Sequence, residues 1–157
     1  MKELRQYRRK TEGKTDYKKR LLLLKSRKPR LVIRKSLRNI QLQLIDYAAK
    51  GDKILISSHS NQLKKLGWKQ VSGNSSSAYL TGLILGLKAK SKNIKEAILD
   101  LGLNRSVKGS VLYAALKGAT ENGLNVPHSK EILPKEKILE GKKDLKETKE
   151  KILREKW

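Results

Sequence analysis

The stretch Ala97–His128, AILDLGLNRSVKGSVLYAALKGATENGLNVPH, is the most informative part of this chain about its fold class. Its first part, 97–101, is an apolar run with the length of a buried strand. A polar loop bounded by glycines follows at 102–109, and Ser110 then caps a helix predicted to run to Asn122. Gly123 ends that helix. This order of strand, loop and helix predicts an α/β domain.

The loop at 102–109 carries two cations, Arg105 and Lys108. It follows the carboxyl end of the predicted strand and precedes a helix N-terminus, whose free N–H groups favour anions. We therefore predict that Arg105 and Lys108 contact an anionic partner; the alternative is that they are ordinary loop cations. The loop does not have the pattern of a phosphate-binding P-loop, because Lys108 precedes its glycine.

The residues before this unit predict a three-strand antiparallel meander. The strands are expected at 31–35, 39–47 and 53–58. The middle strand alternates apolar side chains with glutamines, which is typical of a strand with one buried face. Short polar links between the strands, including Gly51-Asp52, are typical of hairpin turns. With the strand at 97–101, the chain predicts an α/β fold with a mixed sheet.

Further helices are predicted around this sheet. A long helix at 77–90 is apolar around most of its circumference, so we expect it to be largely buried. Its Gly82-x-x-x-Gly86 spacing permits close approach to a sheet or another helix. Ser60 is expected to cap a short helix that runs through Leu66. The segment 129–157 holds ten cations and seven acids, and its i,i+4 ion pairs predict a helical or partly ordered tail.

The composition limits the classes of protein to which the chain can belong. Its 157 residues include no cysteine, so disulfides and thiolate metal sites do not support it, and a reducing compartment is compatible. No apolar run approaches the roughly 18 residues that span a bilayer. No apolar segment follows the basic N-terminus as a secretory signal requires.

The formal net charge of +23 calls for an anionic partner. Nucleic acid is the default, because an anionic membrane usually requires a basic amphipathic helix with bulky aromatics. Sixteen of the 38 cations but only three of the 15 acids lie in residues 1–38. This asymmetry predicts three parts. They are a basic RNA-binding arm and helix at 1–28, an α/β body at 29–128 and a charged tail at 129–157.

The N-terminal arm, 1–14, cannot bury enough apolar surface to fold alone, so we expect it to be mobile until a polyanion neutralises it. A helix is predicted to begin at Thr15-Asp16 and to run to about Arg27. Its leucines at 21–24 suggest that one face docks on the body, while Lys18 and its neighbouring cations remain free for solvent or phosphate.

Catalytic chemistry has little support in the sequence. The two histidines, His59 and His128, are far apart, and neither has a metal or acid–base partner that can be assigned. Asp100 is the carboxylate best placed to serve as a ligand in a metal-dependent RNA-processing enzyme with a ribonuclease-H-like sheet. That enzyme is one alternative function; a protein- or membrane-interaction module built on the C-terminal helix is another. We expect no cofactor and no bound metal.

Binding remains the favoured function. The arm is expected to contact phosphates, which supply affinity and orientation. Double-stranded RNA presents shape and 2′-hydroxyls, so the body is expected to recognise a folded RNA by its shape. Trp68, which lies among cations, is a candidate to stack on an exposed base; the alternative is that it packs as a lid on the sheet edge.

Several stretches resemble the universal 5S rRNA-binding protein family of the large ribosomal subunit, family eighteen, in its archaeal form. They are RRKTEGKTDY at 8–17, SHSNQLKKLGWK at 58–69, GNSSSAYLTGLILG at 73–86, LDLGLNRSVKG and AALKGA within 99–119, and VPHS at 126–129. Together they cover about Met1 to Pro134 in order. The resemblance implies a structural, non-enzymatic protein of the cytoplasmic ribosome that attaches 5S rRNA to large-subunit rRNA in the central protuberance. It also implies a neighbouring ribosomal protein that shares the 5S rRNA.

The resemblance carries RNA contact onto the arm residues Arg5, Arg8, Arg9, Lys10, Lys14, Thr15 and Tyr17, and onto the loop residues His59, Lys69 and Asn74. The complete set of predicted RNA-binding residues adds Tyr7, Lys18, Arg34, Arg38, Trp68, Arg105 and Lys108.

Overall fold

The computed structural model describes residues 6–135, 143–155 and 157. Its sheet has the strand order β3-β2-β1-β4. The strands are β1 (Arg30–Lys35), β2 (Ile40–Asp46), β3 (Lys53–His59) and β4 (Ile98–Asp100). β2 pairs antiparallel with both β1 and β3, whereas β1 pairs parallel with β4. The predicted meander and the mixed sheet are confirmed, with strand ends within one or two residues of the prediction.

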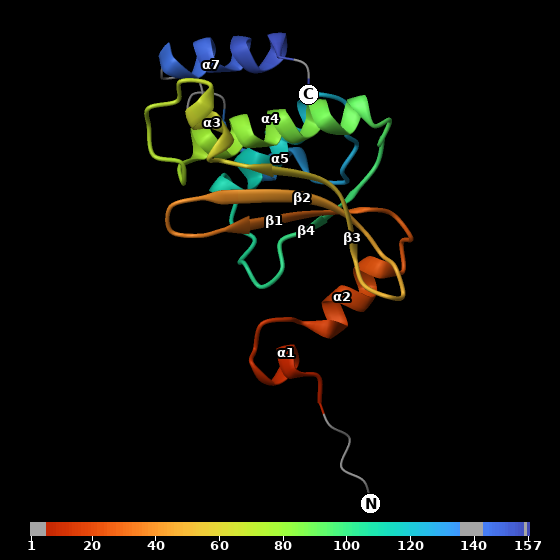
Figure 1. Cartoon of the computed structure of the whole chain (residues 1–157). Helices are drawn as coiled ribbons and strands as arrows, with labels where there is room; N and C mark the ends of the chain where they lie inside the picture. Colours follow the sequence, from red (N-terminus) through yellow and green to blue (C-terminus); the bar gives the residue numbers. More distant parts are fainter. Residues whose placement is uncertain (1–5, 136–142, 156) are drawn as a thin grey trace, which may run out of the picture.

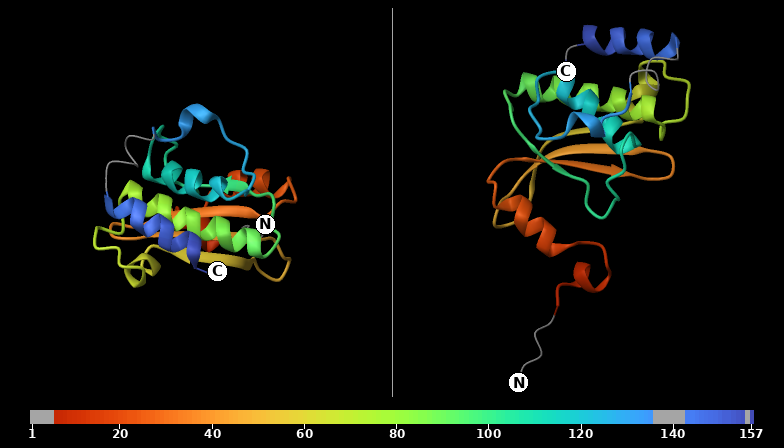
Figure 2. Two further views of the ribbon diagram at one scale, coloured as in Figure 1. Left: turned by 90° about the horizontal axis from the view of Figure 1, so that it is seen from above. Right: turned by 180° about the vertical axis from the view of Figure 1, so that it is seen from behind.

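The helices lie on both sides of this sheet. Two long helices, α4 (Ser75–Ser91) and α5 (Val111–Glu121), cover one face (Figure 1). Beyond them, α7 (Lys143–Arg154) packs on α4 on the side away from the sheet (Figure 2). On the opposite side of the sheet, α1 (Arg8–Thr11) and α2 (Tyr17–Leu24) lead away towards the N-terminus. Two short elements, α3 (Gln62–Lys65) and the 3-10 helix η1 (Lys130–Ile132), complete the described part of the chain.

The alternation in β2 places its apolar residues in the core. Ile40, Leu42 and Leu44 are fully buried beneath α4 and α5, while Gln41 between them is exposed. Burial of these side chains is the main stabilising term for such a sheet, at about 25 cal/mol per Å² of apolar surface. The opposite face of the sheet is therefore the polar one.

Glycines allow α4 and α5 to cross at very short range. A Cβ added at Gly82 would overlap the backbone carbonyl of Ala115, and one at Gly118 would overlap that of Tyr79. A Cβ at Gly86 would lie 2.7 Å from the carbonyl oxygen of Ala119. The Gly82-x-x-x-Gly86 spacing thus serves contact with a helix, one of the two possibilities that the sequence left open.

Helix ends differ from the prediction in their details. Helix α4 begins two residues earlier than expected, at Ser75, because the Asn74 side chain accepts a hydrogen bond from the Ser77 N–H at 2.7 Å and caps it. The N-cap of α3 is Asn61 rather than Ser60. Ser110 is the N-cap residue of α5, but its hydroxyl makes no capping hydrogen bond.

The leucines of α2 dock less than predicted. Leu21 and Leu22 are 60% and 64% exposed, and α2 has no buried residue. The expected apolar docking face is therefore wrong for these two side chains. Helix α2 is instead attached by polar contacts, which are described below.

The predicted helical tail is confirmed for residues 143–154. Leu145, Thr148 and Ile152 are buried, and they recur at the spacing of one helix face. On the same helix Lys149 donates to the Tyr79 hydroxyl at 2.6 Å, and that hydroxyl donates to Glu121 at 2.5 Å. These contacts join α7 to both α4 and α5. No described helix is long and apolar enough to cross a bilayer.

Two lysines reach the free flank of the edge strand β3: Lys88, which lies in α4, and Lys92, which is the C-cap of that helix. Lys88 Nζ donates to the carbonyl of Ser57 at 3.2 Å, and Lys92 Nζ donates to that of Leu55 at 2.9 Å. The Lys88 ammonium also lies 5.0 Å from the ring centroid of Trp157. These carbonyls point away from β2 because β3 is the outermost strand.

Candidate nucleic-acid interface

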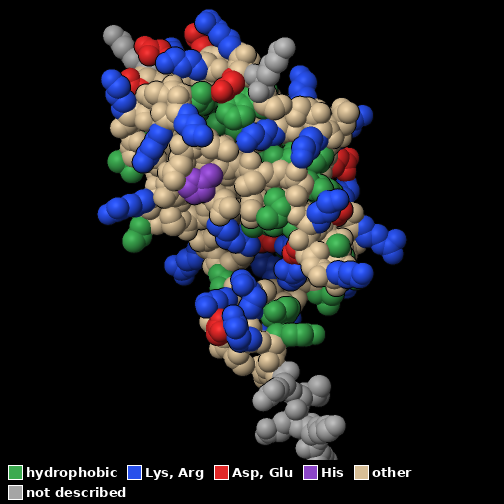
Figure 3. Space-filling model, viewed as in Figure 1, with side chains coloured by type: hydrophobic (Ala, Val, Ile, Leu, Met, Phe, Trp, Pro, Cys, Tyr) green, Lys and Arg blue, Asp and Glu red, His purple; other side chains and the backbone are tan. Residues whose placement is uncertain are grey.

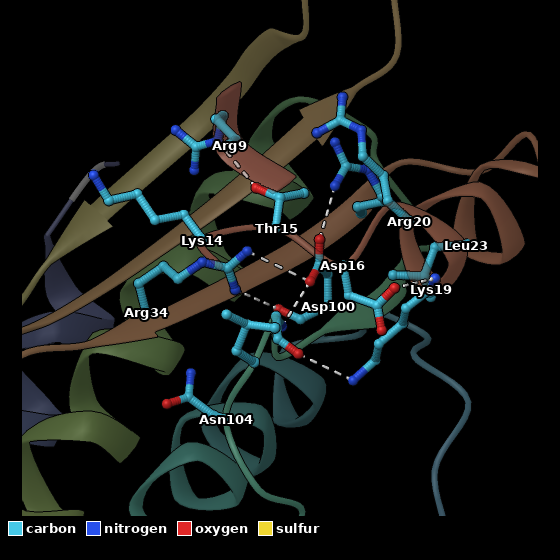
Figure 4. Close-up of a pocket in the computed structure, with 13 residues that line it drawn as sticks. Arg9, Lys14, Thr15, Asp16, Lys19, Arg20, Leu23, Arg34, Asp100 and Asn104 are labelled. Carbon is cyan, nitrogen blue, oxygen red and sulfur yellow. Dashed lines mark hydrogen bonds and ion pairs between the residues drawn. The ribbon is translucent and has the colours of Figure 1, made fainter. Parts of the chain in front are cut away.

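Lysine and arginine side chains dominate the surface around α1 and α2 (Figure 3). A cleft of about 370 Å³ lies there, between the arm and the polar face of the sheet. We call it the arm cleft (Figure 4). Its cationic lining residues are Arg9, Lys14, Lys19, Arg20, Arg30 and Arg34, and its acidic ones are Asp16 and Asp100. The excess of positive charge makes the arm cleft suited to an anion.

Polar contacts attach α2 to the body at two points. Arg20 donates to both carboxylate oxygens of Asp52, each at 2.9 Å, in the turn between β2 and β3. Lys19 donates to the carbonyl of Gly102 at 3.1 Å, in the loop after β4. The Asp16 side chain caps the helix by accepting from the Lys19 N–H at 3.1 Å. These contacts hold α2 over the cleft, together with the half-buried side chains of Leu23 and Leu24.

The floor of the arm cleft is an alternating network of charges. Arg30 is only 3% exposed and donates to Asp100 at 2.7 Å and to Asp52 at 2.6 Å. Arg34 lies above, with 46% of its side chain exposed, and reaches the Asp100 backbone carbonyl at 3.0 Å and its carboxylate at 3.5 Å. The Asp100 carboxylate also accepts from the Gly102 N–H at 2.8 Å. Charge-assisted bonds of this kind are among the stronger ones in proteins.

This network changes the interpretation of Asp100. Its carboxylate is occupied by two arginines and a backbone N–H, so neutralising Arg30 and Arg34 explains its position. No cluster of three or more metal-ligating side chains occurs within residues 6–135, 143–155 and 157. The structure thus gives the alternative of a metal-dependent enzyme no further support.

Of the arm residues predicted to bind RNA, Arg9, Lys14 and Thr15 line the cleft. The rings of Tyr7 and Tyr17 stack with centroids 5.0 Å apart. Arg9 donates to the Thr15 hydroxyl at 3.0 Å. Arg8 and Lys14 both pair with Glu12, at 3.2 and 2.9 Å, and both remain largely exposed. Lys10 and Lys18 are exposed as well, whereas Arg5 falls outside the described residues.

A second, smaller pocket of about 230 Å³ lies on the sheet next to the arm cleft. Its lining consists of Arg34, Lys35, Ser36, Asn39, Gln41 and His59. His59 Nδ1 accepts a hydrogen bond from the Asn61 N–H at 3.1 Å. Because Arg34 lines both cavities, the arm cleft and this pocket form one continuous polar surface.

The other predicted residues do not join this surface as a group. Arg38, Lys69, Arg105 and Lys108 are exposed in loops, and Lys108 pairs with Glu131 at 3.5 Å. Asn74 has a structural task as the cap of α4. The stacking prediction for Trp68 is wrong in this structure, because the indole is 4% exposed and belongs to the core. The packing alternative describes its position.

Sequence reasoning missed several residues of the surface. Arg30 was assigned to no site, although it organises the floor of the cleft. Lys19 and Arg20 were expected to remain free for solvent or phosphate, but both contact the body. Asn104 and Gln41 were assigned to no site, because their positions depend on how the arm and the strands come together. The one signal available for Arg30 was a cation placed directly before an apolar strand, next to Pro29.

Comparison with known proteins agrees with this geometry. The model of a family described as ribosomal large subunit proteins 60S L5 and 50S L18 matches residues 4–96 and 87–129. The large ribosomal subunit protein uL18 of Methanococcus maripaludis is 52% identical over 135 residues, which are 86% of this chain and 70% of that protein. The family model covers most of the arm, the four strands and the helices α4 and α5.

Proposed function

Because the chain belongs to the family of ribosomal large subunit proteins 60S L5 and 50S L18, in its archaeal form, we propose that it binds 5S rRNA and helps attach it to the large-subunit rRNA in the central protuberance. Membership makes it a structural constituent of the large subunit, located in the ribosome of the cytoplasm. We propose three further points: that the RNA is 5S rRNA, that the protein lies in the central protuberance, and that it has no catalytic activity.

The arm cleft is the observation that carries this proposal. Six cations and two acids line it, and several of the cations keep their charged groups in solvent. A cavity open to solvent, with this excess of positive charge and both backbone and side-chain donors, suits a phosphate-rich partner. Arg34 connects the cleft to the polar sheet face, so a large RNA surface can be contacted at once.

We propose that the three parts of the chain have different roles. The arm and helix at 1–28 contact phosphates, and the body at 29–128 fits the folded RNA. Within the tail at 129–157, helix α7 covers α4, as the buried Leu145 and Ile152 indicate. A neighbouring ribosomal protein is proposed to share the same 5S rRNA.

Deleting Met1–Lys14 tests the proposal. The deletion removes six cations and two acids, a net loss of four positive charges. We expect the affinity for in vitro transcribed 5S rRNA, measured by filter binding, to fall about 100-fold or more, because the lost contacts no longer displace counterions from the RNA.

A matched variant tests whether the position of the lost charges matters, or only the loss of net positive charge. Four lysines that are exposed and remote from the arm, Lys90, Lys95, Lys130 and Lys146, are changed together to Gln. This variant also loses four positive charges, yet we expect it to bind 5S rRNA within a few-fold of the wild type. Equal losses in the two variants, or undiminished binding by the deletion variant, would rule out the arm as the RNA contact.

A further inference from the structure

The sheet face opposite α4 and α5 carries polar side chains in register. In antiparallel sheets, directly paired residues project to the same side, and successive residues alternate. Two neighbouring rows of this face are Arg34–Gln41–His59 and Val32–Gln43–Ser57, read across β1, β2 and β3. The long helices cover only the other face (Figure 1).

The hydrogen-bonding groups on these rows are available. Gln41 and Ser57 are exposed and Gln43 is half-buried. Within the described part of the chain, none of these three side chains makes a hydrogen bond to the protein. His59 Nδ1 accepts the hydrogen bond from the Asn61 N–H, which leaves the Nε2–H as a donor. Unpartnered amides and a hydroxyl side by side form a surface that can both donate and accept.

We propose that this face lies in the minor groove of double-stranded RNA and reads 2′-hydroxyls through Gln41, Gln43, Ser57 and His59. The inference rests on the RNA-binding function proposed above and deepens it. The minor groove of A-form RNA is wide and shallow and displays 2′-hydroxyls, each a donor and an acceptor, whereas its major groove is too deep and narrow for side chains to read. Amide and hydroxyl side chains match those groups.

The same rows argue against a platform for single-stranded RNA. Such platforms stack successive bases on aromatic rings. No residue of either row is Phe, Tyr or Trp, and the nearby Trp68 belongs to the core. A face that offers hydrogen bonds without stacking surfaces fits a paired RNA rather than unpaired bases.

Cations lie beside the uncharged side chains of these rows, where the phosphates of a duplex would run. Arg34 lies at the end of one row and also lines the arm cleft. Lys35 and Arg38 follow it in the hairpin between β1 and β2, and both are exposed. Phosphate contacts of this kind position a protein but do not distinguish RNA from DNA. Discrimination against DNA is therefore assigned to the uncharged side chains.

Interference mapping of 2′-deoxy substitutions tests the inference. 5S rRNA is transcribed with randomly placed 2′-deoxy phosphorothioate nucleotides, the bound fraction is isolated, and iodine cleavage locates the substitutions. For the wild-type protein we expect depletion at a few adjacent positions within one helix. The double variant Gln41→Met/Gln43→Met keeps the side-chain length but removes both amides. We expect it to lose that depletion and to bind unmodified 5S rRNA about 3- to 10-fold more weakly for each amide.

Controls keep the test decisive. Gln70→Met removes an amide that contacts Asp144 on α7, far from the sheet face, and should leave the interference pattern unchanged. Ser57→Ala offers a milder change on the same face should the double variant not fold, and it should weaken the depletion at one or two positions.

Each outcome decides a different claim. Binding with no position-specific depletion, or with depletion that persists in the Gln41→Met/Gln43→Met variant, overturns the minor-groove inference and leaves 5S rRNA binding intact. A wild-type protein that does not bind 5S rRNA overturns the proposed function and the inference with it.

Discussion

At the scale of single residues, Arg30 has the largest structural role in the candidate interface. It is nearly inaccessible, it bridges Asp52 and Asp100, and its buried Nε has no hydrogen-bond partner among the residues that the structure describes. Burying a charge is costly unless partners compensate it. Two carboxylates compensate Arg30, and the result is a rigid floor from which Arg34 projects into the arm cleft.

Replacing Asp100 with Asn tests this role. The change removes one of the two charges that compensate Arg30, so we expect the free energy of unfolding to fall by about 3–5 kcal/mol in urea titrations. RNA affinity should not fall, because the cleft becomes more positive. Loss of an RNA-cleaving activity in the folded variant would instead support a catalytic Asp100. The double variant Arg30→Met/Asp100→Leu should recover part of the lost stability.

Lys88 makes stability depend on alkaline pH. Partial burial lowers the pKa of its ammonium below the ordinary 10.5, and the nearby Glu155 acts in the opposite direction. The folded protein therefore releases this proton at a lower pH than the unfolded chain. Over the window between the two pKa values the unfolded chain holds more protons, so the free energy of unfolding rises with pH.

The variant Lys88→Met should lack this contribution. We expect the wild type to gain stability relative to the variant when urea titrations are compared at increasing pH up to 10.5. Parallel pH profiles for the two proteins would show that burial of Lys88 does not affect its protonation.

At the scale of elements, the crossing of α4 and α5 depends on glycine. The substitution Gly82→Ala would place a methyl group on the Ala115 carbonyl, and two helix backbones would have to separate. We expect a loss of about 1–3 kcal/mol in the free energy of unfolding, since overpacking outweighs the better helix propensity of alanine. Ser91→Ala, at the exposed end of the same helix, should stay within about 0.5 kcal/mol of the wild type in the same measurement.

Most of these elements were predictable from the sequence. The alternation in β2, the apolar circumference of α4 and the strand–loop–helix order at 97–122 are local patterns, and the structure confirms each. The exposure of Leu21 and Leu22 was not predictable, because it depends on attachment of α2 through Arg20 and Lys19 to segments far along the chain.

The candidate site was less predictable for the same reason. The sequence indicated the cationic arm, but the arm cleft is formed by side chains from four separate segments. Trp68 is a residue that the sequence placed at the site and the structure does not. A tryptophan among cations has the same local pattern whether it faces solvent or the core. Contacts between distant segments decide such cases, and periodicity does not reveal them.

At the scale of the whole molecule, the charge is arranged along one axis. The arm and cleft lie on one side of the sheet, and α7, with its mixture of acids and cations, lies on the other (Figures 1 and 2). An anionic partner is therefore attracted to the arm side first, and such steering weakens as salt screens it.

Salt should weaken RNA binding steeply. With five or more phosphates neutralised, a fourfold rise in salt concentration should lower the affinity for 5S rRNA by about two to three orders of magnitude. The slope of log affinity against log salt concentration, measured by filter binding, gives the number of phosphates contacted. A slope near zero would contradict an interface built on the arm cleft.

Lys88 and Lys92 have one more consequence, for encounters between two copies of the free protein. The outermost strand of a sheet usually has unpaired carbonyl and N–H groups, with which another polypeptide can form hydrogen bonds, and such pairing can lead to aggregation. Here two of the outward carbonyls of β3 already accept from ammonium groups of the same chain. A second molecule that approached this edge would have to displace those lysines and meet their positive charge, so the two contacts protect the edge against pairing between copies.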